Sequence, residues 1–364
     1  TAIDEATGGA EGSGNRTAEG ETLTREALSA ALLATDDVTG VEALAPTVAA
    51  TLRQPAGDAE RKQREVAAQL GRAADTLSRQ RLGGSALRAL LAIARELAGP
   101  FEAAIHLLHV RTVVDNPIVS PDDLDEVERI LAMSDAKTRE LLESSTDGID
   151  TPSHCHVQRG VSPADAIIEA VSELDCDLVV MGTQGRRGLK GLLIGSVAKE
   201  VVHRSLVPVL TTRVGADRGF PPRKILVAYD SSAESLEAVL VAAEWAQTLQ
   251  AEVTLLHAME PITYPDFYSH YTLRANHMAR LGERCREALD EVGREHLQAV
   301  AYDTAVIHAR PAEGIVDVTS NQNFDLVVLA TRGLSGVAHA LFGSVAERVV
   351  LLSEVPVLTV RGSS

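Results

Sequence analysis

The sequence predicts an α/β protein made of two tandem open parallel five-stranded sheets with helices on both faces. Short apolar runs rich in β-branched residues alternate with longer segments whose apolar residues recur at helical spacing. This alternation is typical of parallel strands that are covered by helices on both sides. Two similar segments of about twenty residues also occur about 150 residues apart, which indicates a duplicated domain.

The two similar segments are DLVVMGTQGRRGLKGLLIGSV at 177–197 and DLVVLATRGLSGVAHALFGSV at 325–345. Further upstream, IHLLHV at 105–110 matches VTLLHA at 253–258. Because the matches occur in the same order in both copies, each copy should be one complete folding unit.

The repeat predicts a first domain at 23–213 and a second at 222–364. A linker with glycine, proline and charged residues separates them at 214–221. Residues 1–22 have the polar, glycine-rich composition of a disordered tail.

The second copy shows the order of elements most clearly. Its predicted strands cover 224–229, 253–257, 303–308, 325–330 and 356–360. Its predicted helices lie between them, at 235–249, 274–298, 312–321 and 344–352. The strands are nearly continuous in apolar residues, as expected for strands that are buried on both faces.

Composition excludes several classes of protein. The chain has 364 residues, 45% of them hydrophobic, with a formal charge of −17, so neither wholesale disorder nor a nucleic-acid-binding surface is expected. It has three cysteines and no CxxC motif, which argues against a disulfide framework or a zinc–cysteine site. No apolar run is long enough to span a membrane and no signal peptide opens the sequence, so we expect a cytoplasmic protein without membrane contact.

A glycine pattern between a strand and a helix predicts a phosphate-binding loop. In the first copy Gly182, Gly185 and Gly195 precede Ser196, which we expect to cap the following helix through its hydroxyl. Glycine lets the backbone approach a ligand, and the amides at the start of a helix favour phosphate. A tight turn without any ligand is the alternative explanation.

An acidic residue, Asp230, closes the first predicted strand of the second copy. In open α/β folds the carboxyl edge of the sheet is where ligands bind. The alternative role for Asp230 is the N-cap of the following helix.

These residues together resemble the universal stress protein family in its tandem, nucleotide-binding form, over roughly 85–361. The resemblance implies a stress-response protein that binds ATP or another adenine nucleotide, with or without magnesium. It implies a Gly-x2-Gly-x9-Gly-Ser loop for phosphates and ribose, and an aspartate near the adenine. The binding residues that it implies are Gly182, Gly185, Gly195, Ser196 and Val197 in the first copy, and Asp230, Ala258, Ala330, Gly333, Gly343, Ser344 and Val345 in the second. It also implies that the halves pack about a pseudo-two-fold axis through their last strands, with further homodimerisation possible.

The sequence departs from the family pattern at two places. Ala330 stands where the second loop should have its first glycine, and alanine cannot easily adopt a positive φ. The first copy also lacks an obvious first strand, which in this fold is central, so that its absence would split the sheet. The best substitute is AALLATD at 30–36, which ends like the second copy's strand and makes 38–84 a mostly helical insertion.

Because Asp36 is placed only by the likeness of 30–36 to the strand that ends at Asp230, we expect the second half to bind nucleotide more tightly than the first. No catalytic arrangement is found: there is no nucleophile–base signature, Walker-type lysine or carboxylate cluster. His154 and His156 share a strand face, but nothing nearby in the sequence supplies a third metal ligand. An interaction module without nucleotide, or a slow ATPase, are the competing functions.

Overall fold

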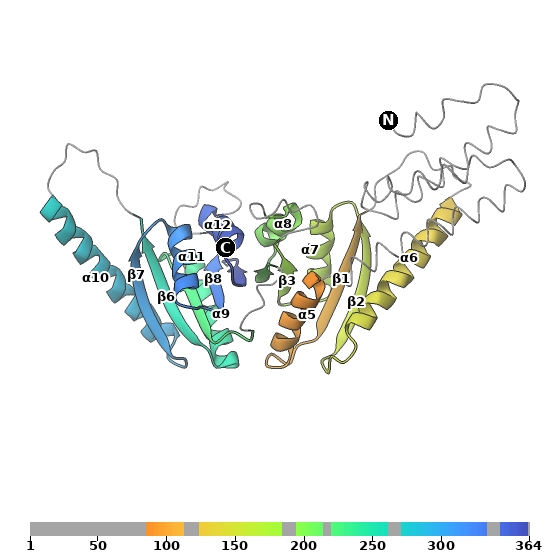
Figure 1. Cartoon of the computed structure of the whole chain (residues 1–364), viewed down its shortest axis with the longest axis horizontal. Helices are drawn as coiled ribbons and strands as arrows, with labels where there is room; N and C mark the ends of the chain where they lie inside the picture. Colours follow the sequence, from red (N-terminus) through yellow and green to blue (C-terminus); the bar gives the residue numbers. More distant parts are fainter. Residues whose placement is uncertain are drawn as a thin grey trace, which may run out of the picture. The chain divides into compact units, whose positions relative to one another are not determined.

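The computed structural model describes residues 85–112, 124–183, 194–213, 220–260, 271–332 and 343–362 (Figure 1). The chain forms two compact units, and each is considered by itself. Within the described residues, the smaller unit comprises 106–112, 124–148 and 153–163, and the larger comprises 85–105, 149–152 and the described part of the chain from residue 164 onward.

The second copy of the repeat forms five parallel strands in the larger unit. They are β5 (Lys224–Ala228), β6 (Glu252–Met259), β7 (Tyr302–His308), β8 (Leu326–Ala330) and β9 (Val357–Val360). Their order across the sheet is β7-β6-β5-β8-β9, with β5 at the centre and every neighbour parallel. The predicted α/β architecture is therefore confirmed.

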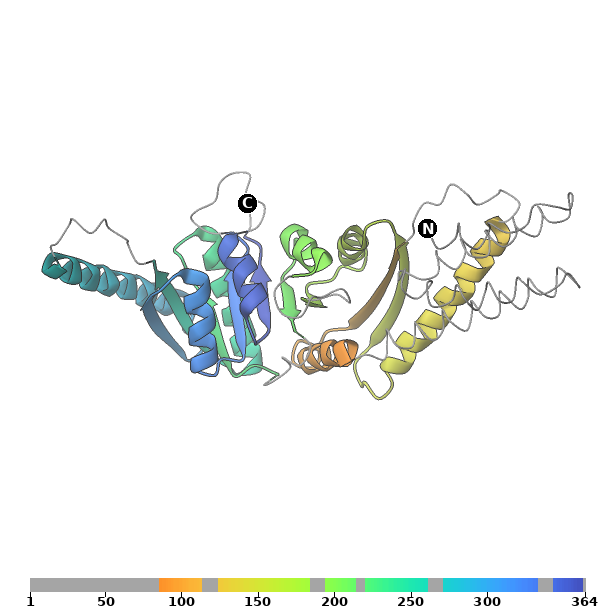
Figure 2. The same ribbon diagram turned by 45° about the horizontal axis from the view of Figure 1, so that its top comes forward.

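Helices cover both faces of this sheet. They are α9 (Ala233–Leu249), α10 (Tyr271–His296), α11 (Pro311–Asn321) and α12 (Ser344–Leu352). Residues of α9 and α10 pack in one hydrophobic cluster, and residues of α11 and α12 pack in another. Figure 2 shows α11 and α12 side by side on their face of the sheet.

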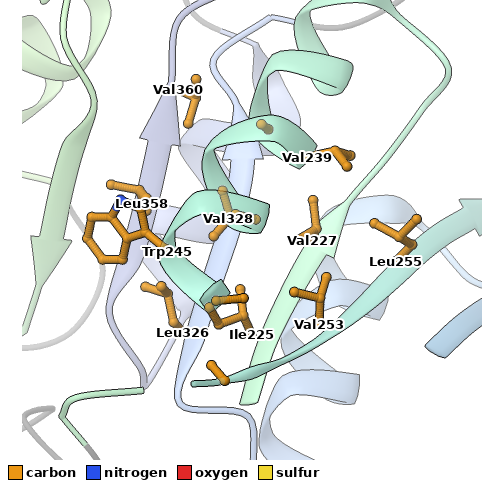
Figure 3. Close-up of a cluster of buried hydrophobic side chains, with 14 of the residues drawn as sticks. Ile225, Val227, Val239, Trp245, Val253, Leu255, Leu326, Val328, Leu358 and Val360 are labelled. Carbon is orange, nitrogen blue, oxygen red and sulfur yellow. The ribbon is translucent and has the colours of Figure 1, made fainter. Parts of the chain in front are cut away.

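The central strand explains why the predicted strands are apolar throughout. Ile225 and Val227 enter the cluster beneath α9 and α10, which is drawn in Figure 3. Leu226, between them, enters the cluster on the opposite face. All three side chains are fully buried, because successive residues of a strand point to opposite faces and both faces are covered.

The first copy adds two strands to the same sheet. β3 (Val179–Gly182) pairs with β4 (Val209–Thr212) in parallel, and β4 pairs with β9 in antiparallel orientation, giving seven strands in all. The Thr211 hydroxyl donates to the Val357 carbonyl at 3.2 Å, and the Thr359 hydroxyl donates to the Val209 carbonyl at 3.1 Å. The predicted meeting of the last strands is confirmed, and it joins the two predicted sheets.

Side chains from both copies complete this interface. α8 (Ser196–Arg204) carries Lys199, whose Nζ lies 2.6 Å from the Glu347 carboxylate of α12. Both residues are exposed and occupy the same position of the repeat with opposite charges, so the pair contributes little, on the order of 0.2–1 kcal/mol. The ring of Phe101, which follows α5 (Ser85–Ala98), lies 5.5 Å from the ring of Trp245.

A further helix of the first copy begins with a proline. α7 (Pro163–Glu173) has its proline at the first helical position, directly after Ser162. Its Ala164 packs with Val201 of α8 and Val209 of β4.

The smaller unit contains β1 (Ile105–Thr112), β2 (Ser153–Gly160) and α6 (Leu124–Ser145). β1 and β2 form a separate two-stranded sheet, and α6 packs on β2 (Figure 1). Arg111 of β1 is buried, with its Nε 3.2 Å from the carboxylate of Asp135, which also accepts from Arg159 at 2.6 Å. This shared carboxylate ties the two strands to the helix.

Among the described residues, the first copy has no counterpart of the central strand β5. Its four described strands are divided between two sheets, which is the arrangement expected when the first strand is absent. The predicted substitute at 30–36 and the predicted insertion at 38–84 lie outside the described residues. Most of the predicted linker at 214–221 does so too. None of the described helices is both long and apolar enough to cross a membrane.

Candidate functional site

The carboxyl edge of the five parallel strands brings several predicted site residues together. Asp230 follows β5, Ala258 lies near the end of β6, and Ala330 ends β8. The Thr331 amide donates to the Val360 carbonyl at 2.9 Å, which holds the end of β8 beside that of β9. Asp230, Ala258 and Ala330 are partly buried.

The two ends of the connection from β8 to α12 are joined by a backbone hydrogen bond. The Gly343 amide donates to the Thr331 carbonyl at 2.9 Å. The first copy repeats this contact, with the Gly195 amide 2.8 Å from the Thr183 carbonyl. In both copies, the glycine before the helix is therefore hydrogen-bonded to the residue that follows the strand.

Gly343 allows a close backbone approach. A Cβ atom placed there would lie 2.9 Å from the Thr331 carbonyl oxygen, closer than real Cβ contacts come. A side chain at this position would therefore force the loop away from the strand end whether or not a ligand binds.

We predict that Gly343→Ala lowers the stability of the ligand-free protein by about 1–3 kcal/mol through this steric contact. The melting temperature of the variant without nucleotide measures the effect. An unchanged melting temperature would show that the loop relaxes freely around the new methyl group.

The helix starts differ from the expected capping. Gly195 and Gly343 occupy the N-cap positions, and Ser196 and Ser344 are the first helical residues. The prediction that the serine hydroxyls cap these helices is therefore wrong, because the caps have no side chain. Both serines are exposed, so their hydroxyls are accessible to a ligand.

The first turn of α12 presents amides without helical acceptors. Its first intrahelical bond runs from the Glu347 amide to the Gly343 carbonyl at 3.0 Å. The amides of Ser344, Val345 and Ala346 precede that bond, and amides at this place in a helix favour anions. In the first copy the Lys199 amide makes the equivalent bond to Gly195, so Val197 corresponds to Val345.

Asp230 organises the turn between β5 and α9. Its Oδ1 accepts from the Ser232 amide at 3.0 Å and from the Ser232 hydroxyl at 2.5 Å. Ser232, in turn, is the N-cap of α9 and accepts from the Ser235 amide at 3.0 Å. The alternative reading of Asp230 as the N-cap is therefore wrong, since it positions the cap instead.

The surroundings of Asp230 are partly desolvated. Burial raises the pKa of Tyr229, and the Asp230 charge raises it further, although a hydrogen bond with Ser231 lowers it. His257 Nδ1 of β6 lies 2.9 Å from the carbonyl of Tyr229, which follows β5, so this contact joins the ends of the two strands.

Several predicted site residues lie outside the described part of the chain. They are Asp36, Gly185 and Gly333. Gly182, at the end of β3, is described and partly buried. The complete first-copy loop therefore stays a prediction.

Sequence reasoning missed the neighbour of the histidine pair. His106 of β1 has its Nδ1 3.0 Å from His156 Nε2, and its ring lies 5.0 Å from that of His154. Burial lowers the pKa values of His106 and His156, and the neighbouring histidines lower them further. Among the described residues no group of three metal-binding side chains is arranged to hold an ion. Pairing of β1 with β2 was the signal that could have placed His106 there.

Comparison with known proteins identifies the fold. The family model of the universal stress protein family matches residues 83–213 and again 222–361. A universal stress protein from Thermus aquaticus is 35% identical over 144 residues, covering 38% of this chain and 98% of the relative. One from Mycobacterium tuberculosis is 25% identical over 246 residues, covering 65% of this chain and 80% of the relative.

A solved structure shows a similar fold. The crystal structure of a universal stress protein from Archaeoglobus fulgidus has a TM-score of 0.50 and 20% identity, covering 74% of this chain and 93% of that one. Since the family model matches more than half of the sequence, in two consecutive copies, the chain belongs to the universal stress protein family as a tandem, two-domain member.

Proposed function

We propose that the protein binds ATP or a related adenine nucleotide in its second half and acts in the cytoplasm as a stress-response regulator. The observation that carries the proposal is the pairing of two features at one sheet edge. The amides that open α12 follow a loop closed onto Thr331, and Asp230 lies at the end of the neighbouring strand β5.

The two features suit opposite ends of a nucleotide. Amides at a helix start favour phosphate, because they carry the positive end of the helix dipole. A carboxylate accepts hydrogen bonds, which suits the amino group of a base or a ribose hydroxyl. We therefore assign the phosphate side to Gly343, Ser344 and Val345, and the nucleoside side to Asp230 and Ala258.

The change at Ala330 is compatible with this site. Ala330 is the last residue of β8 and pairs with Val360, so it has regular strand backbone. A strand residue does not need a positive φ, and the methyl group therefore requires little adjustment.

The most informative test is to identify the small molecule that co-purifies with the protein. We expect an adenine nucleotide to be released when the purified full-length chain is denatured and its supernatant is analysed by mass spectrometry. Protein that carries none, and whose melting temperature does not rise with added ATP, would instead support an interaction module without nucleotide.

A further inference from the structure

The carboxyl edge of the second copy carries basic side chains beyond the helix start. Arg332 follows β8 by two residues, and Arg361 follows β9 directly. The bond from the Thr331 amide to the Val360 carbonyl holds these two strand ends together. Within the described residues neither arginine forms an ion pair with a carboxylate.

The first copy contributes to the same place through the last turn of α8. Arg361 Nη1 donates to the Arg204 carbonyl at 3.1 Å, across the joint between the copies. His203, the preceding residue of α8, is partly buried there. Burial lowers the pKa of His203, and the charges of Arg332, Arg361 and Arg204 lower it further, whereas Glu200 raises it.

One of these cations is already neutralised. Arg204 Nη1 lies 2.5 Å from the Asp165 carboxylate and 2.8 Å from that of Glu200. These hydrogen bonds raise the pKa of Arg204 and occupy its guanidinium. Among the described residues, Arg332 and Arg361 therefore have no carboxylate partner, and His203 forms no ion pair although the Glu200 charge acts on it.

The two copies of the repeat carry different residues at two of the positions of this cluster. In the aligned repeat, His203 corresponds to Leu351, and Arg332 corresponds to Gln184. The first copy therefore faces a leucine where the second copy faces a histidine. Arg361 corresponds to Arg213, so the difference between the copies lies in His203 and Arg332.

We propose that His203, Arg332 and Arg361 form an anion subsite that holds the terminal phosphates of a nucleotide bound in the second half. Two guanidinium groups without a carboxylate partner among the described residues repel one another, and a multivalent anion relieves that repulsion. Guanidinium groups match phosphate oxygens in pairs, and a protonated imidazole adds a further donor. The subsite would thus be shared by both copies, and its nucleotide specificity rests on the function proposed above.

The subsite gives nucleotide binding a pH dependence of known sign. A bound polyphosphate favours protonated His203 and so raises its pKa, which in the free protein lies below the ordinary 6.5. Affinity should therefore rise as the pH falls through the pKa of the complex, and this gain is lost at higher pH. Phosphate groups also titrate near neutrality. The contribution of His203 is therefore the difference in the pH dependence of affinity between the native chain and His203→Leu.

The test uses the full-length chain and three ligands: ATP, AMP and inorganic tripolyphosphate. Two variants remove charge from the subsite, His203→Leu, which copies Leu351, and Arg361→Gln, which keeps a donor for the Arg204 carbonyl. Arg223→Gln is the matched control, since it removes an exposed charge just before β5, at the opposite edge of the same sheet. Calorimetric titration at pH 6 and pH 8 gives the affinities, and melting without ligand checks folding.

We expect each subsite variant to weaken ATP and tripolyphosphate binding by roughly tenfold and to leave AMP binding unchanged. The control should bind all three ligands like the native chain. Equal affinity of native and variant chains for ATP and tripolyphosphate would overturn the subsite, as would an equal loss for AMP. If tripolyphosphate binds through these residues while AMP does not bind, the anion subsite stands and the adenine site proposed above falls.

Discussion

Replacing Asp230 by alanine should weaken ATP binding to the intact chain by roughly tenfold to hundredfold. The carboxylate is partly buried at the carboxyl end of the central strand, where its position is fixed by the Ser232 amide and hydroxyl. A partner left without its hydrogen bond in such a place typically costs about 1–3 kcal/mol. Equilibrium titration with ATP measures this loss directly.

Because Asp230 also holds a turn, the variant needs two controls. Asp230→Asn keeps an oxygen that can accept from the Ser232 amide, so it should preserve the turn and still lose ATP affinity. Asp325→Ala removes a second structural aspartate, which accepts from the Arg223 and Lys224 amides at the opposite edge of the sheet. It should lower stability without changing ATP affinity. Native-like ATP binding by Asp230→Asn would reject the proposed contact between the carboxylate and the nucleotide.

Deleting residues 1–40 should unfold the first half, whereas deleting residues 1–20 should have little effect. In the second half β5 pairs with both β6 and β8. Their counterparts β1 and β3 have no such partner among the described residues. If 30–36 supplies that strand, its removal leaves backbone groups unpaired in a core, a loss too large for a domain of marginal stability.

Hydrogen exchange, measured segment by segment, shows whether the deletion unfolds the first half alone, both halves or neither. Amides of the first half should lose protection in the longer deletion, while those of β5, β8 and the rest of the second half keep it. A 41–364 fragment with native protection throughout would reject the proposed strand and direct attention to residues 70–84.

Much of the second half could be predicted because its pattern has one physical explanation. β8 is apolar at every position and β5 is apolar after Lys224, since both faces of the sheet are covered, and the run of apolar residues therefore marks these strands almost to the residue. The first half could not be predicted equally well. Its central strand was proposed only because residues 30–36 resemble the short segment that ends at Asp230. The long repeat that located the other elements does not include this strand.

The places of Gly343 and Asp230 in the fold could be predicted from the sequence, but the local geometry of the candidate site could not. The loop spacing located Gly343, yet only the structure assigns the N-cap of α12 to that glycine rather than to Ser344. The basic cluster was missed because His203 and Arg361 are more than a hundred residues apart and meet only through the antiparallel pairing of β4 with β9. Sequence comparison of the two copies was a usable signal, since His203 replaces a leucine there.

The central claim, a nucleotide site formed by the second half, is tested most directly by calorimetric titration of the intact chain with ATP. The second copy has its strand-one aspartate in place at Asp230, together with the cations of both copies at the same edge. We therefore expect one strong site per chain, which is lost in Asp230→Ala and largely unaffected by Asp36→Ala. Two equal sites per chain, or a single site that is lost with Gly195→Glu but kept in Asp230→Ala, would contradict the assignment.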